Sequence, residues 1–141
     1  MMVYNAQIGS EYDEVDRAVF QIFENLVSSG MKFDKRILFK IGFMLREILN
    51  NAVEHGNHFE KQLHIDCKVE LISNQLIVEI CDEGEGFDLS DLEARDRYEP
   101  ILKNRHRGHE TIREMGYEIY VKDNCVTTIL NLNKEVVSWN G

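Results

Sequence analysis

Three clusters of polar residues and glycines in this sequence have types and spacings that suit chemistry. In the first, Glu47–Gly56, a carboxylate (Glu47) and a carboxamide (Asn51) lie four residues apart. On a helix such residues share one face, and here that face borders the apolar arc. Polar groups at the border of a core are costly unless a ligand, a water or a partner binds them. The same spacing also fits a surface Glu followed by an Asn near a helix end.

The second cluster is Asp82–Phe87, which directly follows a predicted strand. Asp82 continues the apolar alternation of that strand, so its carboxylate ends a buried face and needs a hydrogen-bond donor. An exocyclic amine on a heterocyclic ligand would supply this donor. Gly84 and Gly86 permit close approach of the backbone to a flat ligand, or a positive φ. A plain glycine turn after a strand is the alternative.

The third cluster, Asn104–Thr111, contains Arg105, Arg107 and Gly108 and opens a predicted short helix. A helix N-terminus with a glycine and nearby arginines is a natural site for an anion. An ordinary helix start with solvated arginines is the alternative.

The hydropathy pattern predicts the elements that position these clusters. The clearest signal is strict apolar–polar alternation over residues 63–71, which is typical of a half-buried strand. Asp34 suits the N-cap of the helix that carries the first cluster. The predicted strands are 3–8, 63–71, 76–81, 117–121 and 126–132, and the predicted helices are 12–29, 35–56 and 108–115. Hairpin strands with separate helices favour an α+β fold, a two-layer α/β sandwich with helices on one face of a sheet.

The composition fits one domain and limits its partners. The 141 residues form a single expected domain, with a core over about residues 10–133. There are 25 Asp and Glu residues against 16 Lys and Arg, for a net charge of −9. Phosphate-backbone binding needs concentrated positive charge, so direct nucleic-acid contact is not expected. An acidic protein still binds a nucleotide when a metal ion and backbone N–H groups balance the phosphate charge.

The first residues of the chain and its three cysteines indicate the cellular compartment in which we expect the protein. Residues 1–7 show no signal-peptide pattern, and no stretch approaches 18 apolar residues, so no membrane span is expected. Cys67, Cys81 and Cys125 are odd in number and widely spaced, without a CxxC pair. We expect reduced, buried thiols and a cytoplasmic location.

In this order, the three clusters resemble the GHKL (Bergerat-fold) ATP-binding domain, which is histidine-kinase-like. They are most similar to the single-domain anti-sigma-factor serine/threonine kinases. Glu47–Gly56 resembles the family's N box, Asp82–Phe87 its first glycine box and Arg107–Thr111 its second. The resemblance covers roughly residues 35–132. It implies a Bergerat fold, with a mixed, mostly antiparallel sheet and helices on one face.

The resemblance also implies a role for each matched residue. Glu47 would be catalytic, either as a general base or by orienting the attacking hydroxyl. Asn51 would be the metal ligand, holding Mg²⁺ through its amide oxygen. Asp82 would accept a hydrogen bond from the adenine amino group of ATP, and Gly84 and Gly86 would let the chain pass close to the adenine.

On the phosphate side, the resemblance implies contacts from Arg107 and from the N–H groups that begin at Gly108 and His109. Residues 88–107 would form the ATP lid. The sequence departs from the family here, because the second box usually reads Gly-x-Gly and this chain has Glu110 at the last position. A carboxylate near a triphosphate repels it unless a cation intervenes.

The implied function is that of an ATP-dependent protein serine kinase. It would transfer the γ-phosphate to a serine of an anti-anti-sigma (STAS-type) protein, sequester a sigma factor and act as a homodimer in transcription regulation. Glu110 favours a hypothesis from a different class, a non-catalytic nucleotide-binding module that regulates a partner by binding alone. A free-standing histidine-kinase catalytic domain and an α+β domain with unrelated glycines are further alternatives.

Overall fold

The chain folds into one sheet covered by helices, as a computed structural model that describes residues 1–84 and 100–135 shows. The lone proline begins a helix, and two hairpins supply four of the strands. In chain order the elements are β1 (Met2–Gly9), α1 (Tyr12–Ser28), α2 (Lys35–Asn51), the π-helical turn η1 (Ala52–Gly56), β2 (His64–Ile72), β3 (Gln75–Cys81), α4 (Pro100–Glu114), β4 (Tyr117–Lys122), β5 (Cys125–Asn131) and α5 (Leu132–Glu135).

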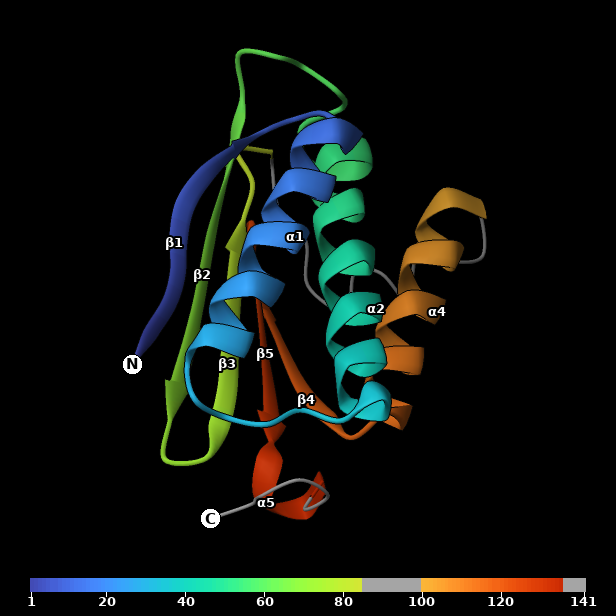
Figure 1. Cartoon of the computed structure of the whole chain (residues 1–141). Coiled ribbons are helices and arrows are strands. Elements are labelled where there is room, and N and C mark those ends of the chain that lie inside the picture. The colour runs from blue at the N-terminus through green and yellow to red at the C-terminus, as the bar shows by residue number, and fades with distance from the viewer. Residues whose placement is uncertain (85–99, 136–141) are drawn as a thin grey trace.

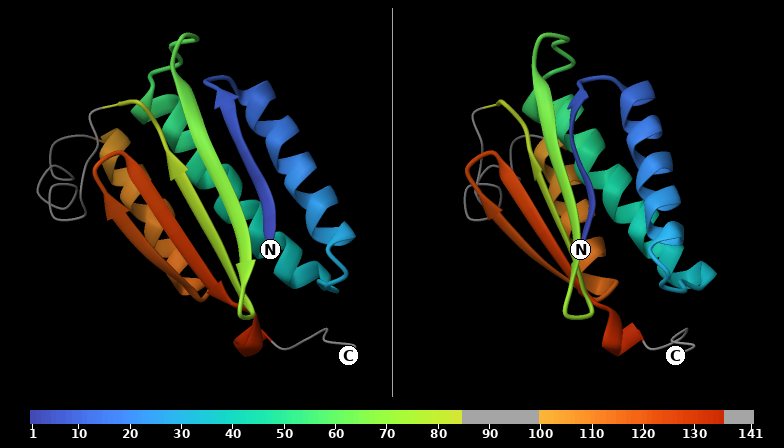
Figure 2. Two further views of the ribbon diagram at one scale, coloured as in Figure 1. Left: turned by 90° about the vertical axis from the view of Figure 1, so that its left-hand side faces the viewer. Right: turned by 60° about the vertical axis from the view of Figure 1, so that its left-hand side comes forward.

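The five described strands form one sheet in the order β1-β2-β3-β5-β4, and each neighbouring pair is antiparallel. Helices α1, α2 and α4 lie side by side against one face of this sheet (Figures 1 and 2). This confirms the predicted two-layer α+β sandwich. No helix in the described part of the chain has the length and apolarity that crossing a bilayer requires.

The core fills the space between the two layers. Along β2 the alternation predicted from sequence is confirmed, because Ile65, Cys67 and Val69 are buried and the residues between them are not. Strand β3 repeats this pattern. Hydrophobic burial of one sheet face against the helices is therefore the main force that assembles the fold.

Helix α2 begins and ends with local features that matter for the site. The Asp34 side chain caps it, since Oδ1 accepts a hydrogen bond from the Ile37 N–H at 2.8 Å, which confirms the predicted N-cap. At its other end the helix widens into the π turn η1, where the Asn57 N–H donates to the Ala52 carbonyl at 2.8 Å. π turns are rare and often occur at functional sites.

The start of the third helix was predicted wrongly. The sequence placed it at Gly108, but α4 begins at Pro100, so Gly108 lies in its interior. Proline is well suited to a first helical turn, where its missing N–H costs nothing, and no helix breaker follows until Gly108. Of the predicted lid, residues 100–107 belong to α4, whereas 88–99 lie outside the described residues.

The prediction of three reduced cysteines is also wrong. Cys81 and Cys125 are directly opposite each other in the β3–β5 ladder and form a disulfide, with Cα atoms 4.1 Å apart. The pairing register, which the sequence does not reveal, brings the two together. Cys67 is free and buried, as predicted. The cytoplasmic location stays a prediction, and disulfides are rare in that compartment.

Thiol labelling checks this assignment. Burial raises the pKa of the Cys67 thiol to about 12, so the folded chain should resist alkylation at pH 8 because almost no thiolate forms. We expect no added label on the folded chain, one label in denaturant, and three labels after reduction in denaturant, measured by intact mass. A Cys67→Ser variant is the control, with two labels after reduction and none before. Three labels without reductant would contradict the disulfide.

Candidate functional site

Glu47 and Asn51 meet on one face of α2. Asn51 is buried, with 7% of its surface exposed, and its Nδ2 donates a long hydrogen bond to Glu47 Oε1 at 3.5 Å. None of the described residues donates to the Asn51 amide oxygen, which is therefore available to a ligand. Two adjacent hard oxygen donors are the kind of ligand that Mg²⁺ prefers.

The Glu47 carboxyl is half-buried, and this changes its acidity. Burial raises its pKa above the usual range, the hydrogen bond from Asn51 opposes this shift, and the negative charge of Glu54 raises the pKa further. A carboxylate that binds a proton more readily than usual is better suited to accept one from a hydroxyl. Glu54 is itself held by a hydrogen bond from the Tyr12 hydroxyl.

The second cluster touches the end of the same helical segment. Asp82 follows β3 and is buried, and its Oδ1 accepts the Gly84 N–H at 2.8 Å. A Cβ atom on Gly56 would lie only 2.1 Å from Asp82 Oδ2, and one on Gly84 only 2.3 Å from the Gly56 carbonyl oxygen. Glycine is therefore required at both positions, because the helix end and the strand end are in direct contact. Gly86 lies outside the described residues.

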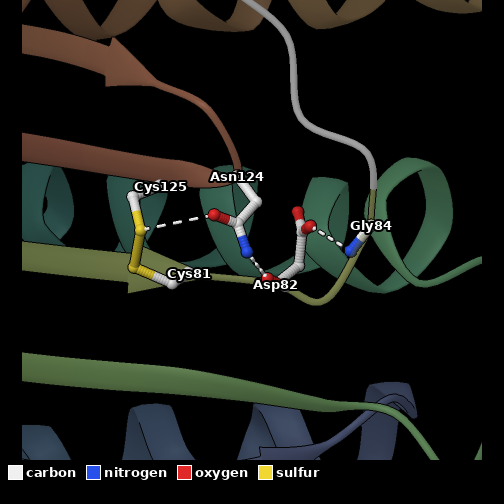
Figure 3. Close-up of a disulfide and its surroundings, with 5 residues drawn as sticks. All are labelled: Cys81, Asp82, Gly84, Asn124 and Cys125. Carbon is white, nitrogen blue, oxygen red and sulfur yellow. Dashed lines mark hydrogen bonds between the residues drawn. A yellow bond between two sulfur atoms is a disulfide. The ribbon is translucent and has the colours of Figure 1, made fainter.

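Asn124 holds Asp82 from the sheet side (Figure 3). The Asp82 N–H donates to the Asn124 carbonyl at 3.0 Å, and Asn124 Nδ2 donates to the Asp82 carbonyl. Each partner adjoins a disulfide cysteine, since Cys81 precedes Asp82 and Cys125 follows Asn124. Asn124 was not among the predicted site residues, because its link to Asp82 depends on strand order.

Asn57 holds the same bend from the helix side. Its side chain is completely buried, and Nδ2 donates to Ser10 Oγ at 2.9 Å and to the His64 carbonyl at 3.0 Å. Its Oδ1 accepts the Glu83 N–H at 2.8 Å. Sequence reasoning missed Asn57 as well, since an asparagine after a helix-ending glycine is indistinguishable from a common turn residue.

The third cluster reaches the first through Gly108. A Cβ atom there would lie 1.9 Å from Glu47 Oε1, so α4 packs directly over the Glu47 carboxylate. His109 is fully buried, whereas Arg107 and Glu110 are exposed. The N–H groups of Gly108 and His109 lie inside a helix, where intrahelical hydrogen bonds engage them. The predicted helix start at Gly108 is therefore wrong, whereas the phosphate contacts of these two residues stay a prediction.

The described residues thus form two contacts along one helical segment, Glu47 with Gly108 and Gly56 with Asp82. Glu47 and Gly56 are nine residues apart, which is roughly 13 Å along a helix axis. The arrangement suits an elongated ligand with a hydrogen-bond donor at the Asp82 end. At the other end a phosphate-bearing group would need a cation beside Glu47.

Comparisons with a protein family and with solved structures agree on the fold of this chain. Residues 10–132 match a family described as "Histidine kinase-like ATPase domain". No curated protein matches significantly. Among solved structures, the chain is similar to the histidine kinase domain of the Erythrobacter litoralis EL346 blue-light activated histidine kinase, with 17% identity and a TM-score of 0.55. The match covers 87% of this chain and 61% of that one, and it supports a shared fold.

A glycine substitution tests the contact between helix end and strand end. Gly84→Ala should lower the free energy of unfolding by about 1–3 kcal/mol, because the new Cβ would overlap the Gly56 carbonyl oxygen. Gly9→Ala is the control, since its Cβ would meet only the movable Glu14 side chain, at 3.3 Å. Urea unfolding compares the two. Equal stability of both variants would contradict the contact.

The raised pKa of Glu47 predicts a gain in stability when its charge is removed. A carboxyl whose pKa is raised by folding stabilises the fold below its ordinary pKa, and this contribution is lost as pH rises through the raised pKa. At pH 7, Glu47→Gln should therefore unfold at a higher urea concentration than the wild type, and this advantage should vanish near pH 4. The exposed Glu24→Gln controls for net charge. A clear loss of stability at pH 7 would contradict the assignment.

Proposed function

The chain belongs to the histidine kinase-like ATPase domain family, and from this premise we propose that it binds ATP with Mg²⁺ and acts as a regulatory protein kinase. The observation that carries the proposal is the buried Asp82 carboxylate held at the end of β3, against the same helical segment that presents Glu47 and Asn51. Both ends of an ATP molecule would find suitable partners along that segment.

The purine would bind at the bend that Asp82 begins. Oδ1 already accepts the Gly84 N–H, and a carboxylate accepts further hydrogen bonds, including one from an adenine amino group. A hydrogen bond to a charged acceptor in a buried place is worth about 1.5–3 kcal/mol, enough to distinguish adenine from a purine without the amine. Gly86, outside the described residues, is proposed to line the adenine on the strength of the family resemblance.

Asn51 and Glu47 would act at the phosphate end. Asn51 offers its amide oxygen to Mg²⁺, and the metal, when bound, neutralises the phosphate charge that the acidic surroundings would otherwise repel. Glu47 would accept a proton from the attacking hydroxyl or orient it. Exposed Arg107 would add positive charge. Phosphate contacts by Gly108 and His109 stay predictions, and they require α4 to begin later than it does here.

The more specific proposal names the acceptor and the rival partner. The acceptor is a serine of an anti-anti-sigma (STAS-type) protein, and a homodimer of this chain sequesters a sigma factor. This part rests on the resemblance of the three clusters to the anti-sigma-factor kinases.

A non-catalytic nucleotide-binding module is the second candidate. It is favoured by the packing of Gly108 over the Glu47 carboxylate, which covers the proposed base, and by Glu110 in place of a glycine. Such a domain would regulate a partner by binding it, with no phosphate transfer.

Calorimetry with ATP and ADP, with and without Mg²⁺, tests the nucleotide site. Asp82→Asn should weaken ATP binding at least tenfold, because it replaces a charged acceptor with a neutral amide. Glu24→Gln, which removes one exposed negative charge from α1, is the control and should keep the wild-type affinity. Unchanged affinity in Asp82→Asn would remove the basis of the proposal.

Labelled ATP, Mg²⁺ and a STAS-type protein with a candidate serine separate the two functions. The kinase proposal expects phosphoprotein with the wild type and none with Glu47→Gln, although this variant still binds ATP. Partner binding without phosphoprotein in the wild type would favour the non-catalytic module.

A further inference from the structure

Each backbone N–H group in the Asp82–Gly84 bend has a specific acceptor. The Asp82 N–H binds the Asn124 carbonyl at 3.0 Å, and the Gly84 N–H binds Asp82 Oδ1 at 2.8 Å. The Glu83 N–H, between them, binds Asn57 Oδ1 at 2.8 Å. The Glu83 bond is the one of these three that ties the bend to a residue from the helix layer.

We propose that Asn57 is a positioning residue for purine recognition, acting on the Asp82 carboxylate through the Glu83 N–H. The inference rests on the proposed ATP site. Asn57 does not touch the nucleotide in this proposal. It fixes the backbone that carries the acceptor, so that the carboxylate meets the purine without first losing conformational freedom.

The geometry gives Asn57 little choice of orientation. Its side chain is completely buried, and both of its donor hydrogens have acceptors, Ser10 Oγ and the His64 carbonyl. The π turn fixes its backbone, because the Asn57 N–H donates to the Ala52 carbonyl. The remaining oxygen is therefore held toward the Glu83 N–H, and a carboxamide satisfied on both sides is a rigid support.

The support from Asn57 also sets the position of the Asp82 carboxylate. The Gly84 N–H bonds to Asp82 Oδ1, so a bend that shifts at Glu83 also disturbs the carboxylate. Gly56 leaves no space on the other side, since a Cβ there would lie 2.1 Å from Asp82 Oδ2. Small displacements of the bend would therefore move the carboxylate away from a purine.

Ser10 offers a matched control for a merely structural role. It is also completely buried, it accepts from Asn57 Nδ2, and its Oγ donates to the Leu63 carbonyl at 2.7 Å. No bond of Ser10 reaches the bend. Ser10→Ala thus weakens the same buried network while leaving the Oδ1 bond to Glu83 in place.

The test combines purine discrimination with amide exchange. ATP and ITP differ at the position of the adenine amine, so the ratio of their affinities reports how well the Asp82 carboxylate is placed. We expect Asn57→Ala to reduce the ATP-to-ITP affinity ratio about tenfold and Ser10→Ala to change it by less than about twofold, because only Asn57→Ala removes the acceptor of the Glu83 N–H. Hydrogen exchange at Glu83 and Gly84 should accelerate in Asn57→Ala and not in Ser10→Ala.

The outcomes separate this inference from the proposed function. An unchanged affinity ratio in Asn57→Ala, or equal losses in Ser10→Ala, would overturn the positioning role. If the variants fail to fold, the wild type decides, because a Glu83 amide that exchanges as fast as that of the exposed turn residue Asn74 would also overturn it. A wild type that binds no ATP, with slow exchange at Glu83, would refute the proposed function and leave the support of the bend standing.

Discussion

The site depends on direct backbone contact between the end of the α2–η1 segment and the end of β3. Gly56 and Gly84 lack the side chains that would keep the two apart, and Asp82 fills the space between them. The contact fixes where a buried carboxylate stands relative to Glu47 and Asn51 on the same helical segment. If it were lost, the two polar clusters would belong to separate parts of the molecule.

Much of this could be predicted from the sequence, because periodicity reports burial. The alternation of β2 and the Asp34 cap appear in the structure as predicted. A close approach of the backbone at Gly84 was also predicted, and in the structure the neighbour that requires it is the Gly56 carbonyl. The remaining features depend on contacts between distant segments. Asn124 meets Asp82 because β5 lies beside β3 in the sheet, and the sequence does not reveal this strand order.

The start of α4 shows a different limit. Glycine is a weak helix former and often marks a helix end, so Gly108 was assigned to a terminus. In the structure, Gly108 lies inside α4 because of packing. It is the residue that lets α4 approach the Glu47 carboxylate. The same contact keeps an acidic side chain half-buried at a cost in stability at neutral pH. Sites that bind or react commonly hold such groups, which folding alone would not favour.

The disulfide has a topological consequence for the molecule. Cys81 and Cys125 are 44 positions apart, so the peptide between them is part of a closed covalent ring that includes Asp82, Asn124 and the whole of α4. A single peptide cut between the two cysteines would open the ring but leave the two fragments joined through the disulfide, beside β3 and β5. After such a single cut, the segment carrying Gly108 cannot diffuse away from the rest of the protein until the cystine is reduced.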